Sequence, residues 1–212
     1  MSNRPAGGAR SKRWERSDYD FYREPPWLAE QIFDELTFGE RDALDLIYDP
    51  CCGTGNILDI AKQRGHPTIG GDIIDRHPRH RFSRGNILTN QTIPSAPPGR
   101  SISVVTNPPY SYEPDIAEKI IRRVLDVVPI RRAAFILPIA FLAGQNRWRF
   151  FSRDLRPSHV LICSQRPTMP PGNLIDEMVS PFEGGMADYV VLVWSHPHKF
   201  RTEGRWLQPR VK

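Results

Sequence analysis

The sequence predicts an α/β fold built on a mostly parallel sheet, and three observations support this prediction. Short apolar runs rich in β-branched residues alternate along the chain with amphipathic segments of helical period. A glycine-rich turn joins one of these runs to the helix that follows it. The length of 212 residues suits a single domain. We therefore expect right-handed crossovers, with ligands bound at the carboxyl ends of the strands.

The first half of the chain supplies two predicted helices and three predicted strands. Prolines stand at the start of the first helix, where a missing N–H is tolerated, and Gly65 stops the second. The strands are short and apolar, and polar loops rich in His, Arg and Pro surround the third. The expected helices cover 25–36 and 57–65, and the expected strands cover 44–49, 68–72 and a short run near Phe82.

The second half repeats the alternation. An amphipathic helix follows the fourth strand, with its isoleucines and valines on one face and its basic residues on the other. The expected strands cover 101–106, 132–138, 159–163 and 187–194, and the expected helices cover 115–128 and 146–155.

Composition divides the chain into one domain with two basic ends. Residues 1–17 mix basic residues with Gly, Pro and Ser, so we expect a disordered basic arm there. The folded domain is expected over 18–194 and a basic tail over 195–212. Arginine makes up 24 of the 29 basic residues, and the formal net charge is +5. Guanidinium groups suit phosphates and base edges, so a nucleic-acid partner is expected; a GC-rich genome would give the same bias.

Other features bear on compartment and metals. Cys51, Cys52 and Cys163 lack metal-ligand spacing, so we expect reduced thiols and no metal. No apolar run approaches the ~18 residues of a membrane span, and the amino-terminal residues lack the apolar core of a secretory signal. These features predict a cytoplasmic protein that does not enter a membrane.

The stretch Asn107-Pro108-Pro109-Tyr110 ends the fourth predicted strand abruptly. Two consecutive prolines cannot donate to a sheet or continue a helix, so the chain turns out of the sheet here. This places an amide and an aromatic ring on a stiff loop at a strand end. Such a loop suits the gripping of a small planar group, since Gly, Asp or Ser would serve for a turn alone.

The glycine turn DPCCGTGNIL, from Asp49 to Leu58, restricts the choice of cofactor. No Gly-Lys-Ser/Thr follows, which excludes a P-loop, and Leu58 occupies the third glycine position of a dinucleotide motif. Asp72 ends the next strand at about the spacing of a carboxylate that binds ribose hydroxyls. Asp49 is placed to receive an ammonium group. A cofactor with a ribose, an ammonium group and no pyrophosphate fits these needs, as S-adenosylmethionine does.

These motifs, in this order and spacing, resemble the class I S-adenosylmethionine-dependent methyltransferases. The resemblance is narrower to enzymes that methylate the exocyclic amine of adenine, in the short forms that phages and prophages encode. FYREPPW, from Phe21 to Trp27, is similar to the family's amino-terminal segment, and ADYVVLVW to its last strand. The resemblance implies a Rossmann-like methyltransferase fold. It implies a mostly parallel seven-stranded sheet with helices on both faces and an antiparallel last strand.

The resemblance also implies which residues bind the cofactor. Phe21, Tyr22 and Pro25 would lie at the methionine end, and the methionine and ribose side would be lined by Asp49, Gly53 and Gly55. Those at the ribose and adenine are Asp72, Ile73, Asn86 and Ile87. The remaining implied cofactor-binding residues are Pro50, Cys51 and Asn107. Asn86 departs from the family, which more often has Asp there. The doubled cysteine is also unusual, and both cysteines are interpreted as small packing residues.

The implied catalytic residues are Asn107, Pro108, Pro109 and Tyr110. The Asn107 side-chain oxygen and the Pro108 carbonyl would each accept one N–H of the target amine, and Tyr110 would stack on the flipped base. The expected reaction is methyl transfer to the N6 amine of adenine in DNA. RNA adenine and the glutamine side chains of proteins remain alternatives, as does a cofactor-fold module that only binds a partner. No segment is long enough for a separate target-recognition domain, so loops, the basic tail after Ser195, a partner subunit or a homodimer would supply recognition.

Overall fold

The computed structural model describes residues 17–40, 43–76, 78–185, 187–197 and 201–209. The predicted basic arm lies outside the described residues except for Ser17. Within the described parts of the chain, every helix is too short or too polar to cross a membrane.

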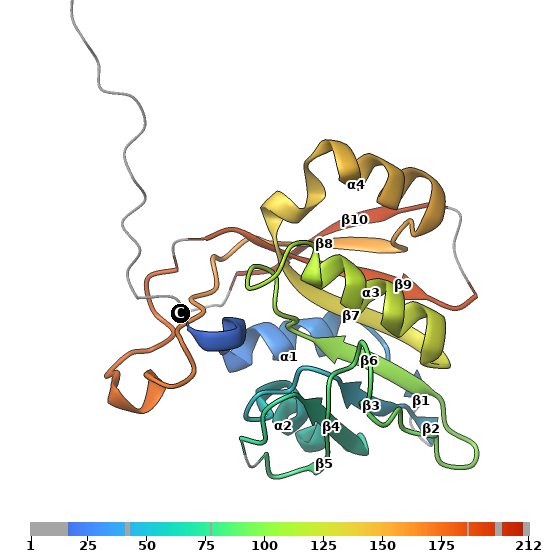
Figure 1. Ribbon diagram of the computed structural model, residues 1–212, viewed down its shortest axis with the longest axis horizontal. Helices are drawn as coiled ribbons and strands as arrows, with labels where there is room; N and C mark the ends of the chain where they lie inside the picture. The colour runs from blue at the N-terminus through green and yellow to red at the C-terminus, as the bar shows by residue number, and fades with distance from the viewer. Residues whose placement is uncertain (1–16, 41–42, 77, 186, 198–200, 210–212) are drawn as a thin grey trace, which may run out of the picture.

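One eight-stranded sheet forms the centre of the molecule, in the order β10-β8-β9-β7-β6-β3-β4-β5, which runs from top to bottom of Figure 1. All neighbouring pairs are parallel except those of β9, which is antiparallel to both β7 and β8. The predicted α/β class, the mostly parallel sheet and the antiparallel last domain strand are confirmed. The strands are β3 (Leu46–Asp49), β4 (Thr68–Asp72), β5 (Arg81–Arg84), β6 (Ile102–Thr106), β7 (Ile130–Pro138), β8 (His159–Cys163), β9 (Tyr189–Ser195) and β10 (Glu203–Leu207).

The eighth strand was not expected. β10 (Glu203–Leu207) lies in the stretch predicted as a basic tail and pairs in parallel with β8 at the sheet edge. Most of its residues are exposed and only Leu207 is buried, so it lacks the apolar run that marks the other strands. A separate two-stranded hairpin, β1 (Gly39–Glu40) and β2 (Ala43–Leu44), precedes β3.

Helices cover both faces of the sheet, as predicted. On one face α1 (Pro26–Glu35) and α2 (Asn56–Gln63) pack together over a core that includes Ile47, Val105 and Ile136. On the other face α3 (Ile116–Val127) packs over Tyr48, Val104 and Phe135. Neighbouring residues of each strand point to opposite faces, which explains why the buried central strands are apolar throughout.

The predicted helix at 146–155 forms as two pieces. A short α4 (Gln145–Arg149) continues into a π-helical turn, η3 (Phe150–Asp154), and Phe150 is buried against Trp194 of β9. Three 3-10 turns complete the described helical elements: η1 (Asp18–Asp20), η2 (Ile139–Leu142) and η4 (Ile175–Glu177).

Three strands that end at one edge of the sheet bring the predicted motifs together. β3 ends at Asp49, β4 ends at Asp72 and β6 ends at Thr106, directly before Asn107. The segment 17–25 lies against the loop after β8, since Tyr22 pairs with Pro171 as an isolated bridge. The sheet edge, the amino-terminal segment and this loop therefore meet at one place.

Candidate active site

A pocket lies at this edge and encloses about 730 Å³, including its open mouth. Twelve of the sequence-predicted residues line it: Phe21, Tyr22, Asp49, Pro50, Cys51, Gly53, Asp72, Ile73, Asn86, Ile87, Asn107 and Pro109. Four of the predicted residues, all in the described part of the chain, lie outside its lining: Pro25, Gly55, Pro108 and Tyr110. Pro25 caps α1 and Gly55 caps α2.

The glycine turn lies under the ring of Phe21. Gly53 has φ +53°, and a Cβ at this position would lie 2.7 Å from Cε2 of Phe21. A Cβ on Gly172 would lie 2.2 Å from the same ring, and the Arg76 guanidinium lies 3.9 Å from the ring centroid. Glycine is therefore required on both sides of the ring, because any side chain would displace it. The amino-terminal segment therefore covers the glycine turn.

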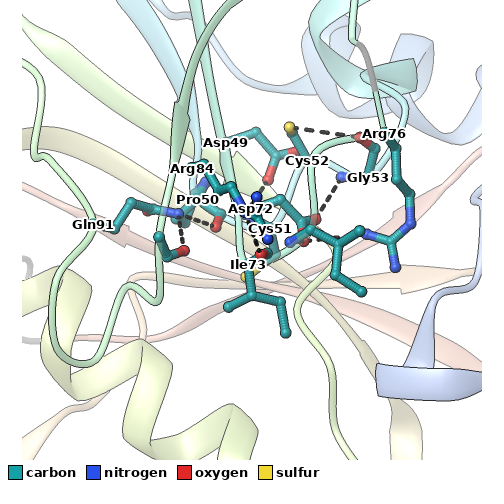
Figure 2. Close-up of polar contacts among 12 residues, drawn as sticks. Asp49, Pro50, Cys51, Cys52, Gly53, Asp72, Ile73, Arg76, Arg84 and Gln91 are labelled. Atoms are coloured by element: carbon teal, nitrogen blue, oxygen red, sulfur yellow. Dashed lines mark hydrogen bonds and ion pairs between the residues drawn. The ribbon is translucent and has the colours of Figure 1, made fainter.

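Asp72 joins the glycine turn to the loop after β4. Its Oδ2 accepts the N–H of Gly53 at 2.9 Å, and its Oδ1 accepts the N–H of Ile74 at 3.0 Å. Arg76 pairs with the same Oδ1 at 3.1 Å, as Figure 2 shows. A carboxylate has about four acceptor positions, so Asp72 keeps capacity for a further donor in the pocket.

Asp49 and Glu24 are buried carboxyl groups in the lining of the pocket. Burial raises the pKa of Asp49 well above its usual range, and the nearby Glu24 and Asp72 carboxylates raise it further. Burial also raises the pKa of Glu24. Because burial is the main cause in both cases, the ionised forms are costly in the pocket, and a cationic ligand beside them would lower that cost.

The two cysteines of the turn are not activated. Burial raises the pKa of Cys51 well above its usual range, and burial does the same for Cys52. The Cys52 sulfur lies close under Gly70, where a Cβ would come within 2.7 Å of it. A thiol with a raised pKa is a poor nucleophile, which agrees with the interpretation of both residues as packing residues.

Asn86 holds the loop after β5. Its Oδ1 accepts the N–H of Leu88 at 2.9 Å, and its own N–H donates to Asn90 Oδ1 at 2.8 Å. The side-chain oxygen of Asn86 thus has a local partner already. Gln91, which the sequence analysis missed, bridges this loop to the glycine turn. It donates to the Pro50 and Gly85 carbonyls at 3.1 and 3.0 Å and accepts from the Tyr48 hydroxyl.

The side-chain nitrogen of Asn107 has hydrogen-bond partners, whereas its side-chain oxygen has none among the described residues. Its Nδ2 donates to the Tyr22 carbonyl at 3.3 Å and to Glu24 Oε2 at 3.1 Å. Its Oδ1 is buried and has no hydrogen-bond partner among the described residues. A buried acceptor without a partner is costly, so it marks a place where a donor from a ligand fits.

Asp20, also missed by the sequence analysis, fixes the loop that follows Asn107. Its Oδ2 accepts the backbone N–H groups of Tyr110, Ser111 and Tyr112 at 3.2, 2.5 and 2.7 Å. Its Oδ1 accepts the Ser111 hydroxyl at 2.8 Å. Asp20 lies 90 residues or more before these partners in sequence, and no local pattern indicates the contact.

The aromatic residues of the loop differ in position. The Tyr110 hydroxyl lies 3.1 Å from that of Tyr189, and burial raises the pKa of Tyr110 well above its usual range. Tyr112 and Tyr19 instead line the pocket, with ring centroids 5.9 Å apart. The predicted stacking role of Tyr110 stays a prediction. Among the described residues, no three His, Cys, Asp or Glu side chains gather as a metal site would require.

Comparison with solved structures agrees with this fold. No protein-family model and no curated protein matches the chain. A human protein containing a methyltransferase 10 domain matches with a TM-score of 0.50 and 13% identity, over 85% of this chain and 90% of that one. The 23S rRNA methyltransferase ErmE matches with a TM-score of 0.51 and 16% identity, over 82% and 68%. A dimethyladenosine transferase from Plasmodium falciparum matches with a TM-score of 0.50 and 16% identity, over 80% and 60%.

The fold is therefore the Rossmann-like fold of class I methyltransferases. The added strand β10 (Glu203–Leu207) extends the sheet of seven strands that the resemblance implied. Sequence identities of 13–16% show the fold alone, so the reaction is argued from the residues of the site.

Proposed function

We propose that this protein is an S-adenosylmethionine-dependent methyltransferase that modifies the exocyclic N6 amine of adenine in DNA. The observation that carries the proposal is the buried, unpartnered Oδ1 of Asn107 on the wall of the pocket. An acceptor without a donor, beside a pocket that favours a cation, fits an amine substrate next to a cationic cofactor.

The pocket residues fit S-adenosylmethionine on physical grounds. The buried carboxyl group of Asp49 matches a ligand with an ammonium and a sulfonium group, because a cation beside it would offset the cost of burying its charge. Gly53 lies in the pocket lining three residues before α2, so the backbone of the glycine turn borders the cofactor space. Asp72 would take the ribose hydroxyls, and Ile73 and Ile87 would contact the adenine ring. When bound, this cofactor supplies an electrophilic methyl group.

The residues of the acceptor loop would then orient the target amine. The lone pair of an adenine amine is delocalised into the ring, which makes the nitrogen a weak nucleophile. Asn107 Oδ1 would accept one N–H and the Pro108 carbonyl the other, so that the nitrogen becomes pyramidal and its lone pair points along the transfer direction. Positioning and electrostatics supply most of the rate enhancement in such a site.

RNA is the second candidate substrate. Two of the solved structures with this fold are named as an rRNA methyltransferase and a dimethyladenosine transferase. The arginine bias of the chain suits either nucleic acid. The resemblance of the sequence motifs to adenine methyltransferases of DNA makes adenine in DNA the first substrate to test, and adenine in RNA is the second.

The test uses the full chain and S-adenosylmethionine with a labelled methyl group. Unmethylated duplex DNA, single-stranded DNA, total RNA and a protein extract rich in release factors are incubated in parallel and then analysed by nucleoside and peptide mass spectrometry. We expect N6-methyladenine in a DNA pool. Label in RNA alone would select the second candidate, and label in protein alone would show that glutamine is the acceptor. No label in any pool would contradict the proposed function.

Asn107→Ala tests whether methyl transfer needs the Oδ1 acceptor of Asn107. We expect transfer to fall by about 100-fold or more, the size found when one preorganised polar group is removed from a reacting centre. The affinity for S-adenosylhomocysteine should stay within about threefold, since the side chain's role is towards the amine. Gln63→Ala removes an exposed amide at the far end of α2 and serves as the control. Loss of cofactor affinity in Asn107→Ala, with transfer falling in proportion, would refute the assignment.

A further inference from the structure

Glu24 is a buried carboxylate that the resemblance did not assign. It is 6% exposed and lies two residues before the start of α1 at Pro26. Its backbone carbonyl accepts Asn56 Nδ2 at 3.3 Å, and Arg23 donates to Asn56 Oδ1 at 2.6 Å. Asn56 is the first residue of α2, so these contacts tie the backbone at Glu24 to the start of the helix behind the glycine turn.

The contacts of Asn107 fix the orientation of its amide. The two N–H groups of Nδ2 meet the Tyr22 carbonyl at 3.3 Å and Glu24 Oε2 at 3.1 Å. A backbone carbonyl accepts and never donates, and an ionised carboxylate does the same. Rotating the amide by half a turn would set Oδ1 against both oxygens. The oxygen and nitrogen of an asparagine have nearly the same shape, so partners of this kind decide which one faces the pocket.

Keeping a carboxylate in this buried place is unfavourable by itself. Burial raises the pKa of Glu24, and the Asn107 hydrogen bond and the Arg23 charge oppose this rise. Methionine or leucine would fill the same space without desolvating a charge. Packing alone therefore does not explain an acidic side chain at position 24, whereas the hydrogen bond from Asn107 does.

We propose that Glu24 is a positioning residue that, with the Tyr22 carbonyl, holds the Asn107 amide so that Oδ1 is presented to the substrate amine. This inference rests on the proposed function. It assigns Glu24 to the part of the pocket that would receive the substrate amine. The rival role is direct binding of the cofactor's ammonium group, since Glu24 also lines the pocket.

Two substitutions separate these roles. Glu24→Gln keeps an oxygen that can accept from Nδ2 and removes the charge, whereas Glu24→Met keeps the length and removes the acceptor. We expect Glu24→Met to lower kcat by about 10- to 100-fold, the effect of a lost hydrogen bond to a charged group. Glu24→Gln should keep kcat within about threefold, and both should bind S-adenosylhomocysteine within about threefold of the unmodified protein. Glu30→Met, on the exposed face of α1, is the matched control.

A spectroscopic readout tests the contact without turnover. The side-chain N–H signals of Asn107 in ¹⁵N-labelled protein are assigned by their loss in Asn107→Ala. We expect them to shift strongly in Glu24→Met, weakly in Glu24→Gln and not at all in Glu30→Met. This measurement also applies if no substrate is methylated, so failure of the proposed function and failure of this inference are distinguishable.

Three results would overturn the inference. Unchanged kcat in Glu24→Met, or unchanged Asn107 amide signals in that variant, would show that the contact does not position the amide. Weakening of S-adenosylhomocysteine binding by about tenfold in both Glu24 variants, with kcat kept at saturating cofactor, would assign Glu24 to the cofactor instead.

Discussion

Replacing Asp20 should loosen the loop that contains Asn107 and the two prolines after it. The structure allows the loss in free energy of unfolding to be divided into a hydrogen-bond part and a backbone part. The carboxylate accepts three backbone N–H groups and one hydroxyl from the loop, and Asp20 is 7% exposed. Asp20 also has φ +53°, in the left-handed region. Asp20→Asn, Asp20→Gly and Asp20→Ala change these two features separately.

The expected costs follow from hydrogen-bond and backbone terms. Asp20→Asn keeps the acceptor of the three N–H groups and tolerates positive φ. It loses the charge and the acceptor of the Ser111 hydroxyl, which should cost about 1–2 kcal/mol. Asp20→Gly leaves three N–H groups without their acceptor and should cost about 3–4 kcal/mol. Asp20→Ala adds the strain of a Cβ at positive φ, about 1 kcal/mol more than glycine.

Urea unfolding followed by circular dichroism and fluorescence measures these differences, with Asp18→Ala as the control. Asp18 lies in the same turn, η1, and is exposed, so its variant should stay within about 0.5 kcal/mol of the unmodified protein. A cost for Asp20→Asn as large as that for Asp20→Ala would refute the reasoning. So would a cost under about 0.5 kcal/mol for Asp20→Gly, because either result would show that the carboxylate does not hold the loop.

Three further predictions concern the pocket. Gly53→Ala should lower the affinity for S-adenosylhomocysteine by about tenfold or more, measured by calorimetry, because its Cβ would displace the Phe21 ring; unchanged affinity would contradict the close contact. The raised pKa values of Asp49 and Glu24 mean that the folded protein without cofactor binds protons more tightly than the unfolded chain. Its free energy of unfolding should therefore fall as pH rises above the ordinary carboxyl range of about 4, towards the raised values. A cationic cofactor favours the ionised form of Asp49, so its affinity should weaken as pH falls towards the ordinary carboxyl range of about 4. Asp49→Asn should reduce this dependence, and an equally steep dependence in that variant would exclude Asp49 as its source.

The fold was predictable from the sequence where burial is continuous. The strand β6 is buried at all five positions, so its apolar run is uninterrupted and its end at Asn107 is sharp. β10 (Glu203–Leu207) escaped prediction because an edge strand with exposed residues, such as Glu203 and Trp206, carries no alternation or apolar run. Pairing with β8, rather than local composition, makes it a strand.

The site was predictable where its residues act through local backbone geometry. Gly53 and the two prolines after Asn107 are marked by the turns they form, so their place at a strand end follows from the sequence. Asp20 and Glu24 act through contacts with residues more than 80 positions away. In the polar stretch that holds them, an acidic residue that is buried looks the same as one that is solvated. Only the folded chain shows which acids have partners.

The contacts around residue 107 also explain why this chain has asparagine there. An aspartate would offer the same acceptor towards the pocket, but its second oxygen would face the Tyr22 carbonyl and the Glu24 carboxylate. That arrangement needs an extra proton to be stable, since acceptors would otherwise meet without a hydrogen between them. Asparagine carries the two N–H groups at all pH values and keeps Oδ1 free. The choice of amide over acid at the acceptor position is thus tied to the acid at Glu24, which lies in the segment that also sets Phe21 over the glycine turn.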